Sequence, residues 1–175
     1  MPFTPFHFGP ALLFGLLFFK RLHFPTFLIA NVVVDLEPLL ILLFGLGLPF
    51  HGFFHSFLGA AILALVLGTV MLTSDKVTRK ITAPLELVQR ASAKSVFLAS
   101  FAGVGMHILL DSVLYADIKP FFPLSANPFY WGSPLAFSAI YGFCIFSFFL
   151  GIALFALRTA KGGGMPREKP RQKSF

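Results

Sequence analysis

The chain has 175 residues, of which 57% are hydrophobic and only 12% are charged, and its mean hydropathy is +0.83. Soluble domains carry about 25% charged residues, and one small core has no room for 25 Phe side chains. High hydrophobicity excludes a disordered chain, and the lone Cys144 excludes a disulfide framework or a multi-cysteine zinc site. The class that remains is an integral membrane protein.

Five apolar segments are the candidates for membrane helices. About 20 apolar residues span the hydrocarbon core of a bilayer. The first segment, residues 10–19, is short, because ten helical residues cover only about 15 Å. The other four segments have the required length and comprise residues 24–48, 52–73, 95–115 and 134–157. These lengths predict an all-α fold, a polytopic membrane helix bundle with about five membrane segments.

The basic residues predict how this bundle lies in the membrane. They follow the first segment, separate the third from the fourth and follow the last, and Lys119 is the exception among the 14 Lys and Arg residues. Since basic loops stay in the cytoplasm, the N-terminus is expected outside and the C-terminus inside the cell (inner) membrane. Residues 1–160 are expected to form a single transmembrane domain, and residues 161–175 a disordered basic cytoplasmic tail.

The same asymmetry accounts for the high isoelectric point. A pI near 9.9 is common in proteins that bind nucleic acid, but cytoplasmic loops and a basic tail beside anionic lipid headgroups explain it here. We therefore expect the lipid bilayer as a partner and no nucleic acid.

Seven ionisable side chains lie within or at the edges of the apolar segments, where such groups are costly and by default functional. They are His7, Asp35, Glu37, His51, His55, His107 and Asp111. With the N-terminus outside, all seven are able to converge in the outer half of the membrane. Histidine and carboxylate ligands without a thiolate suit zinc, manganese or iron. We expect zinc, with one to three ions, because one zinc takes only three or four protein ligands.

The spacing of these residues supports a shared site. Residues 51–55 and 107–111 each place two ligand side chains four positions apart, which brings both to one face of a helix. Asp35 and Glu37 are two apart and would diverge on a regular helix. Pro38 disfavours the helical conformation for Glu37, so we expect a break that aims both carboxylates at one point. Such a backbone is tolerated in a membrane only where protein or a wet cavity covers it.

A site of this composition favours hydrolysis of a phosphoester, because several metal ions together activate water and bind both oxygens of the displacement. The expected metal ligands are His7, Asp35, His51, His55, His107 and Asp111. Glu37 is expected as the general base, with Asp35 as a second catalytic carboxylate. Asp117 is expected to be a turn or cap residue and not a ligand.

Two other functions stay open at this point. A metal that only staples the helices would suit a structural or lipid-binding protein, because metal binding adds folding energy to a small scaffold. A divalent-metal transporter is the other possibility. The short chain, the lack of an internal repeat and a site displaced from the midplane stand against transport.

In these residues the chain resembles the YdjM-like family of membrane-bound metal-dependent hydrolases. That family has an N-terminal His, an Asp-x-Asp-type pair, a His-x-x-x-His-Ser block and a His-x-x-x-Asp block before a Pro-rich loop. The corresponding residues look like His7, Asp35 and Glu37, His51, His55 and Ser56, and His107 and Asp111, in the same order over roughly the first 130 residues.

The resemblance implies a metal-dependent hydrolase that acts on a phosphoester or lipid. The family is thought to be distantly similar to zinc-dependent phospholipases C. Two positions depart from the family pattern. Gly52 stands where many members have Arg or Lys, and Glu37 is the second acid of the pair and is followed by Pro38. If the missing cation binds a substrate phosphate in those members, the substrate differs here.

Overall fold

The structure is a computed structural model that describes residues 4–160. Within this range every regular element is a helix, so the predicted all-α class is confirmed. The elements are η1 (Thr4–His7), α1 (Phe8–Leu17), α2 (Phe24–Val33), α3 (Leu36–Phe44), η2 (Phe53–His55), α4 (Phe57–Thr73), α5 (Asp75–Thr82), η3 (Ala83–Leu85), α6 (Ala93–Leu114) and α7 (Pro134–Ala160). The tail predicted at residues 161–175 lies outside the described residues.

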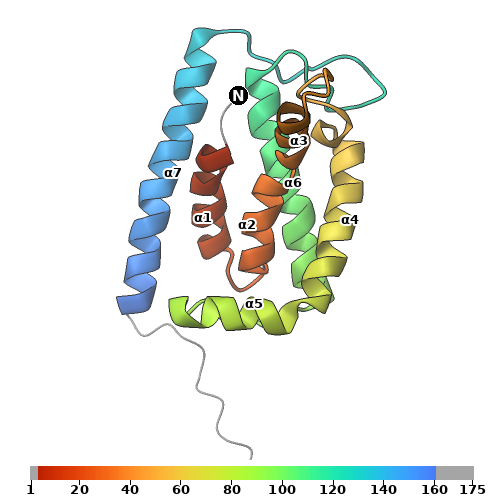
Figure 1. Cartoon of the computed structure of the whole chain (residues 1–175). Helices are drawn as coiled ribbons and strands as arrows, with labels where there is room; N and C mark the ends of the chain where they lie inside the picture. Colours follow the sequence, from red (N-terminus) through yellow and green to blue (C-terminus); the bar gives the residue numbers. More distant parts are fainter. Residues whose placement is uncertain (1–3, 161–175) are drawn as a thin grey trace, which may run out of the picture.

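The long helices lie side by side, and α5 lies across one end of the bundle (Figure 1). Helix α6 packs against both α2 and α4, and α1 packs against α2 and α7. Small residues make these contacts close. Gly103 of α6 faces Ala30 of α2 with no room for another carbon atom, and Ala60 and Ala64 of α4 are buried. Close backbone approach through small residues is typical of helix packing in membranes.

The outside of the bundle is apolar. Large side chains such as Leu135, Phe146, Phe149 and Leu157 of α7 are more than half exposed, whereas His55, His107 and Asp111 are among the buried residues. A continuous apolar surface of this kind marks contact with a membrane. It also explains how the chain accommodates 25 Phe residues, because many of them face lipid and not a core.

Two helices, α6 and α7, are each long and apolar enough to cross a membrane. The number rises to four if each of two bent pairs is one span: α2 with α3, bent by 41°, and α4 with the following helix Asp75–Leu85, bent by 77°. The predicted segment 10–19 corresponds to α1, a shorter apolar helix of 10 residues. The structure therefore supports membrane helices at the predicted places, with two to four spans by length and composition.

The predicted break in the second segment is present, but it lies one turn before Pro38. Helix α2 ends at Val33, and α3 begins at Leu36. Proline lacks a backbone N–H and clashes with the carbonyl four residues earlier, which belongs to Val34. Glu37 is helical, contrary to our expectation, because the first turn of a helix tolerates proline and the residues before it. The break instead leaves Asp35 in the bend.

The basic segments gather at the end of the bundle that carries α5. The turn between α1 and α2 contains Lys20 and Arg21, α5 contains Lys76, Arg79 and Lys80, and the C-terminal end of α7 lies at the same end (Figure 1). This grouping is what the loop charges predict. The assignment of this end to the cytoplasm stays a prediction, because the structure contains no membrane.

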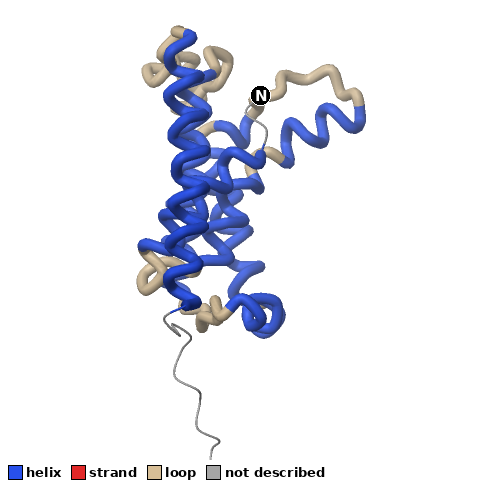
Figure 2. Tube along the Cα trace, turned by 90° about the vertical axis from the view of Figure 1, so that its left-hand side faces the viewer, coloured by secondary structure: helices blue, strands red, loops and turns tan. Residues whose placement is uncertain are grey.

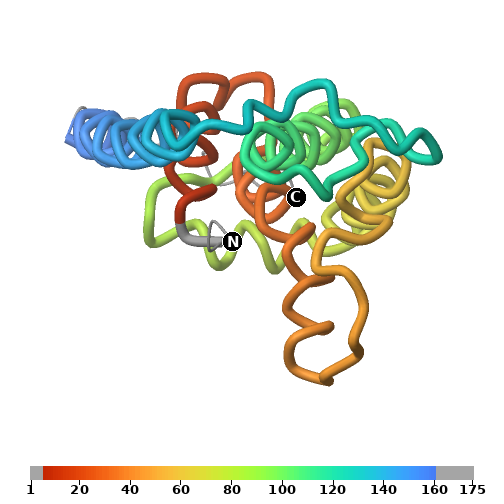
Figure 3. The backbone as a smooth tube through the Cα atoms, turned by 90° about the horizontal axis from the view of Figure 1, so that it is seen from above, coloured from red at the N-terminus to blue at the C-terminus, as the bar shows by residue number. Residues whose placement is uncertain are grey.

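Helix α3 and the loop after it stand out from the bundle (Figures 2 and 3). The helix ends at Gly45, which adopts a left-handed conformation with φ of 58° that glycine tolerates at no steric cost. Leu42, Leu43 and Phe44 are 62%, 67% and 70% exposed. The loop then returns to the bundle at η2, so the chain leaves the bundle after Asp35 and re-enters it at His55.

Candidate metal centre

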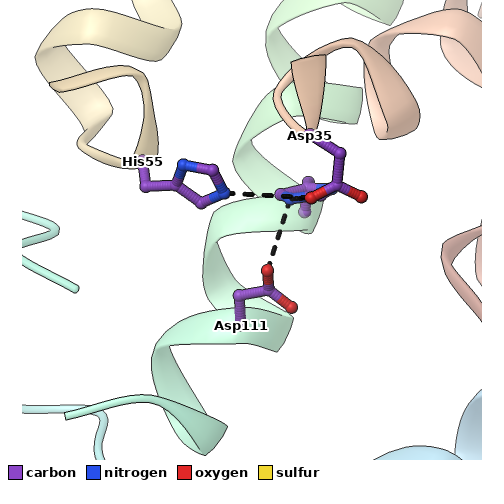
Figure 4. Close-up of side chains that lie close together, drawn as sticks. Asp35, His55 and Asp111 are labelled. Atoms are coloured by element: carbon purple, nitrogen blue, oxygen red, sulfur yellow. Dashed lines mark ion pairs between the residues drawn. The ribbon is translucent and has the colours of Figure 1, made fainter. Parts of the chain in front are cut away.

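Four side chains from three parts of the chain converge at one point inside the bundle. Asp35 lies in the bend between α2 and α3, His55 ends η2, and His107 and Asp111 lie one turn apart on α6. One ligand atom of each residue lies within 4.8 Å of the corresponding atoms of the others. Figure 4 shows the Asp35, His55 and Asp111 side chains pointing toward one another. We call these four residues the central cluster.

The distances within the central cluster are those of groups arranged around an ion. His107 Nε2 lies 3.5 Å from an oxygen of Asp35 and 3.4 Å from an oxygen of Asp111. His55 Nε2 lies 3.9 Å from the same oxygen of Asp35. His55, His107 and Asp111 are at most 1% exposed, and the Asp35 side chain is 14% exposed. Asp35 is therefore the member that solvent or a ligand reaches.

Hydrogen bonds outside the cluster set the protonation of both imidazoles. His107 Nδ1 lies 2.8 Å from the main-chain carbonyl of Asn31. Because a carbonyl only accepts, Nδ1 carries the hydrogen. His55 Nδ1 lies 3.0 Å from a carboxylate oxygen of Glu37, which makes it a donor as well. A neutral ring with its hydrogen on Nδ1 presents the Nε2 lone pair to the cluster, the arrangement in which histidine binds metals.

The buried Nε2 atoms of His55 and His107 have no hydrogen-bond partner in the described part of the chain, and they lie 3.4–3.9 Å from carboxylate oxygens of Asp35 and Asp111. Lone pairs of nitrogen and oxygen thus face one another away from water. Buried polar atoms without partners cost about 1–3 kcal/mol each, and a shared cation satisfies all of them together. The residues present therefore fit a divalent metal with nitrogen and oxygen ligands.

His7 borders the central cluster on one side. Its Nε2 atom lies 3.1 Å from Oδ1 of Asp111, and its ring stacks on that of His107 with centroids 4.1 Å apart. The residue is 1% exposed and belongs to η1, directly before α1. The structure thus brings His7 next to one predicted ligand but not into the four-residue group.

His51 lies on another side and makes different contacts. Its Nδ1 atom lies 2.8 Å from a carboxylate oxygen of Asp117, and its ring contacts those of Tyr115 and His55. The prediction that His51 and His55 share one face of a helix is wrong. The first helical residue after them is Phe57, and the N-cap Ser56 accepts a hydrogen bond from the backbone N–H of Gly59. Both histidines precede α4.

Residues 7–165 match the family model described as YdjM inner membrane protein. The chain belongs to the YdjM inner membrane protein family. The match begins at His7 and extends beyond α7, so it includes every residue of the central cluster. It confirms the resemblance drawn from the motifs and the location in the inner membrane. No curated protein and no solved structure matches the chain.

In this YdjM family member, Glu37 supports the cluster from outside. Its carboxylate accepts from His55 Nδ1 and, at 3.4 Å, from the backbone N–H of Phe54. The carboxylate also lies against the α-carbon of Gly52, where any Cβ would collide with it. This contact explains in physical terms why this chain has glycine at position 52.

Three contacts of the site have no signal in the sequence motifs. Asn31 contributes only a main-chain carbonyl to His107, which any residue type is able to supply. Asp117, expected as a turn residue, accepts the hydrogen bond from His51. Asn127 donates 2.9 Å hydrogen bonds to the carbonyls of Ser112 and Tyr115. Those carbonyls belong to the last turn of α6, where helices leave acceptors unsatisfied.

His23 is the buried histidine that takes no part in the site. It lies in the turn between α1 and α2, is 1% exposed, and its Nδ1 atom is 2.7 Å from the Thr26 hydroxyl. Burial lowers its pKa from the ordinary value of 6.5, and the negative charge of Asp75 opposes that shift. Its contacts are those of a structural residue, which makes it a matched control for the cluster histidines.

Proposed function

We propose that this protein is a membrane-embedded, metal-dependent hydrolase that acts on a phosphoester at the outer face of the inner membrane. The observation that carries the proposal is the convergence of two imidazole Nε2 atoms, from His55 and His107, on the carboxylates of Asp35 and Asp111. Two carboxylates and two neutral imidazoles are a ligand set that zinc binds readily. Manganese and iron accept the same donors.

The central cluster is the part that would hold a metal ion. His7 and His51 are proposed as ligands of additional ions on different sides of the cluster, because His7 lies beside Asp111 and the His51 ring lies 4.9 Å from that of His55. When bound, a divalent metal supplies Lewis acidity toward a phosphoryl oxygen and makes a water molecule acidic enough to react near neutral pH.

The remaining residues orient groups and move protons. Glu37 holds the His55 ring by its Nδ1–H, which supports a positioning role, and we also propose it as the general base predicted from the sequence. Asp35 is the most exposed member of the cluster and is proposed to contact the substrate or the attacking water. In the reaction, the water oxygen bonds to phosphorus, the ester P–O bond breaks and the proton passes to the leaving oxygen.

A second candidate function is structural, in which a bound metal only holds the helices of the bundle together. The near-complete burial of His55, His107 and Asp111 favours it, because structural metal sites are closed and catalytic sites keep an open position. Such a metal would join the α2–α3 bend, η2 and α6. It would add stability and support no turnover.

Turnover distinguishes the two functions. The purified protein in lipid nanodiscs is incubated with zinc and tested on a phospholipid and on a soluble phosphodiester, beside Asp35→Asn and the α5 variant Asp75→Asn. The hydrolase predicts phosphoester cleavage that a chelator abolishes, that falls at least 100-fold in D35N and that persists in D75N. Bound metal with no cleavage of either substrate would contradict the hydrolase and favour the staple.

A further inference from the structure

Two apolar hollows lie side by side on the surface of the bundle and share Phe8 and Leu28 as walls. The first has a volume of about 540 Å³ and lies against α1 and α7, where Leu12, Cys144 and Phe148 line it. The second has a volume of about 490 Å³ and runs along α2 to the segment after α5. Both volumes are in the range of ligand-binding pockets. Together we call them the apolar groove.

The lining of the apolar groove is hydrocarbon almost throughout. Among the described residues, Thr82 and Cys144 are the lining residues whose side chains carry a hydroxyl or thiol, and none of the lining side chains is charged. In a membrane protein such a surface is in contact with lipid chains. Its shape as a groove, and not a convex helix face, allows it to hold particular chains in place.

One end of the groove adjoins the central cluster through shared segments. Phe6 and Phe8 line the groove, while His7 between them reaches Asp111. Leu36 lines the groove, while its neighbour Asp35 belongs to the cluster. Two separate segments of the chain thus place an apolar residue in the groove and its neighbour at the cluster. Phe6, Phe8 and Leu36, which line the groove, are thus next in sequence to two residues of the site.

The groove also has the length of a lipid chain. It follows α2 from Val33 to Phe24 near the basic end, and it also includes Leu36, the first residue of α3. The ten residues of α2 rise about 15 Å, which is half of the roughly 30 Å hydrocarbon thickness of a bilayer.

We propose that the apolar groove binds the acyl chains of a membrane phospholipid and places its headgroup phosphoester at the central cluster. The two hollows, joined at Phe8 and Leu28, suit a lipid with two chains. The inference deepens the proposed function by naming its substrate class, and its catalytic part rests on that function. The binding part does not, so the two are tested separately.

The binding test uses the full chain in nanodiscs that contain a phospholipid with a photoactivatable diazirine at the end of one acyl chain. Cross-links mapped by mass spectrometry are expected on α2 and α7 peptides that line the groove. Leu28→Trp fills the shared wall and is expected to reduce these cross-links at least fivefold. Val32→Trp, at the cluster end, provides a second blocked variant. Leu65→Trp, on the exposed face of α4 and 51% exposed in the native chain, is the matched control and leaves the cross-links unchanged.

Three results decide the inference. Cross-links enriched in the groove and lost in both blocked variants support it. Labelling of α4 around Leu65 as strong as that of α2 overturns it, because the groove then holds lipid no better than any outer face. The inference is also overturned if lipid cross-links are missing and a second copy of the chain covers Leu28.

The activity test separates this inference from the proposed function. If both hold, Leu28→Trp lowers the ratio of phospholipid to soluble phosphodiester turnover at least tenfold, and Leu65→Trp leaves that ratio within twofold. Groove labelling without turnover of either substrate contradicts the hydrolase and leaves lipid binding supported. Turnover of the soluble substrate without groove labelling contradicts the groove alone.

Discussion

The Nδ1 nitrogen of His107 lies 2.8 Å from the main-chain carbonyl oxygen of Asn31. This contact joins α6 to α2 and fixes which nitrogen of the ring carries the hydrogen. Helix packing alone places the two residues there, because Gly103 and Ala30 allow the helices to meet one turn below. The ring is held with its Nε2 atom toward Asp35 and Asp111. The same bond therefore serves the fold and the site.

The first prediction concerns Glu37. In Glu37→Gln the side chain still accepts from His55 Nδ1 but loses the negative charge that strengthens this bond. We expect the zinc affinity to fall about 10- to 100-fold, the usual effect of changing a residue that orients a metal ligand. Competition with a chromogenic chelator measures it. Glu86→Gln, in the loop after η3, is the control, and equal affinities of E37Q and the wild type would contradict the positioning role.

The second prediction concerns Gly52. An alanine Cβ at this position would occupy the place of the Glu37 carboxylate, so Gly52→Ala is expected to displace that carboxylate and weaken zinc binding about tenfold. The two changes act through one contact and are not expected to add. The double variant G52A/E37A should therefore bind zinc as E37A does, because no carboxylate is left for the new Cβ to displace. A further loss of zinc affinity in the double variant would show that Gly52 acts by another route. The control is Gly142→Ala, because a Cβ at this position of α7 meets nothing within 4 Å.

The third prediction compares two glycines of α6. Gly103→Ala would push against Ala30 and the carbonyl of Phe27 on α2, and we expect a loss of about 1–3 kcal/mol in the free energy of unfolding, as for other overpacked sites. Gly105→Ala meets nothing within 4 Å and is expected to stabilise the helix by roughly 0.5–1 kcal/mol. Chemical unfolding in detergent measures both, and similar effects of the two substitutions would contradict the packing described.

The fourth prediction is a pH dependence. Burial lowers the pKa of His23 from its ordinary value of 6.5, with Asp75 opposing the shift. Below pH 6.5 the unfolded chain binds a proton that the folded chain resists, so stability falls as the pH falls. Well above pH 6.5 His23 is neutral in both the folded and the unfolded chain, so this loss of stability is absent. His23→Gln removes it, and unfolding at pH 5 and pH 7.5 should show a smaller difference in the variant than in the wild type. An unchanged difference would contradict a buried neutral His23.

The sequence predicts well what depends on composition and local spacing. The apolar content predicts a membrane helix bundle, and the loop charges predict the common end of Lys20, Arg21 and α5. The interval from His107 to Asp111 predicts their contact, because both lie on one regular helix, and their closest nitrogen and oxygen atoms are 3.4 Å apart.

Contacts between distant segments are beyond such reasoning. The pairing of His51 with Asp117 joins two loops that have no periodic pattern. His55 reaches Glu37 because α3 leaves the bundle and the chain returns, a path that depends on the bend at Asp35 and the left-handed Gly45. Pro38 indicates that a break exists, but the position of the break depends on how α2 packs against α6. These features require the three-dimensional arrangement.

The most direct test of the account is the number of metal ions per chain. The wild type, His107→Gln and His23→Gln are purified in nanodiscs, incubated with zinc, washed and analysed by inductively coupled plasma mass spectrometry. The account predicts at least one zinc ion per chain in the wild type and in H23Q, and almost none in H107Q. A wild type that binds no metal, or an H107Q variant that retains the wild-type amount, would contradict it.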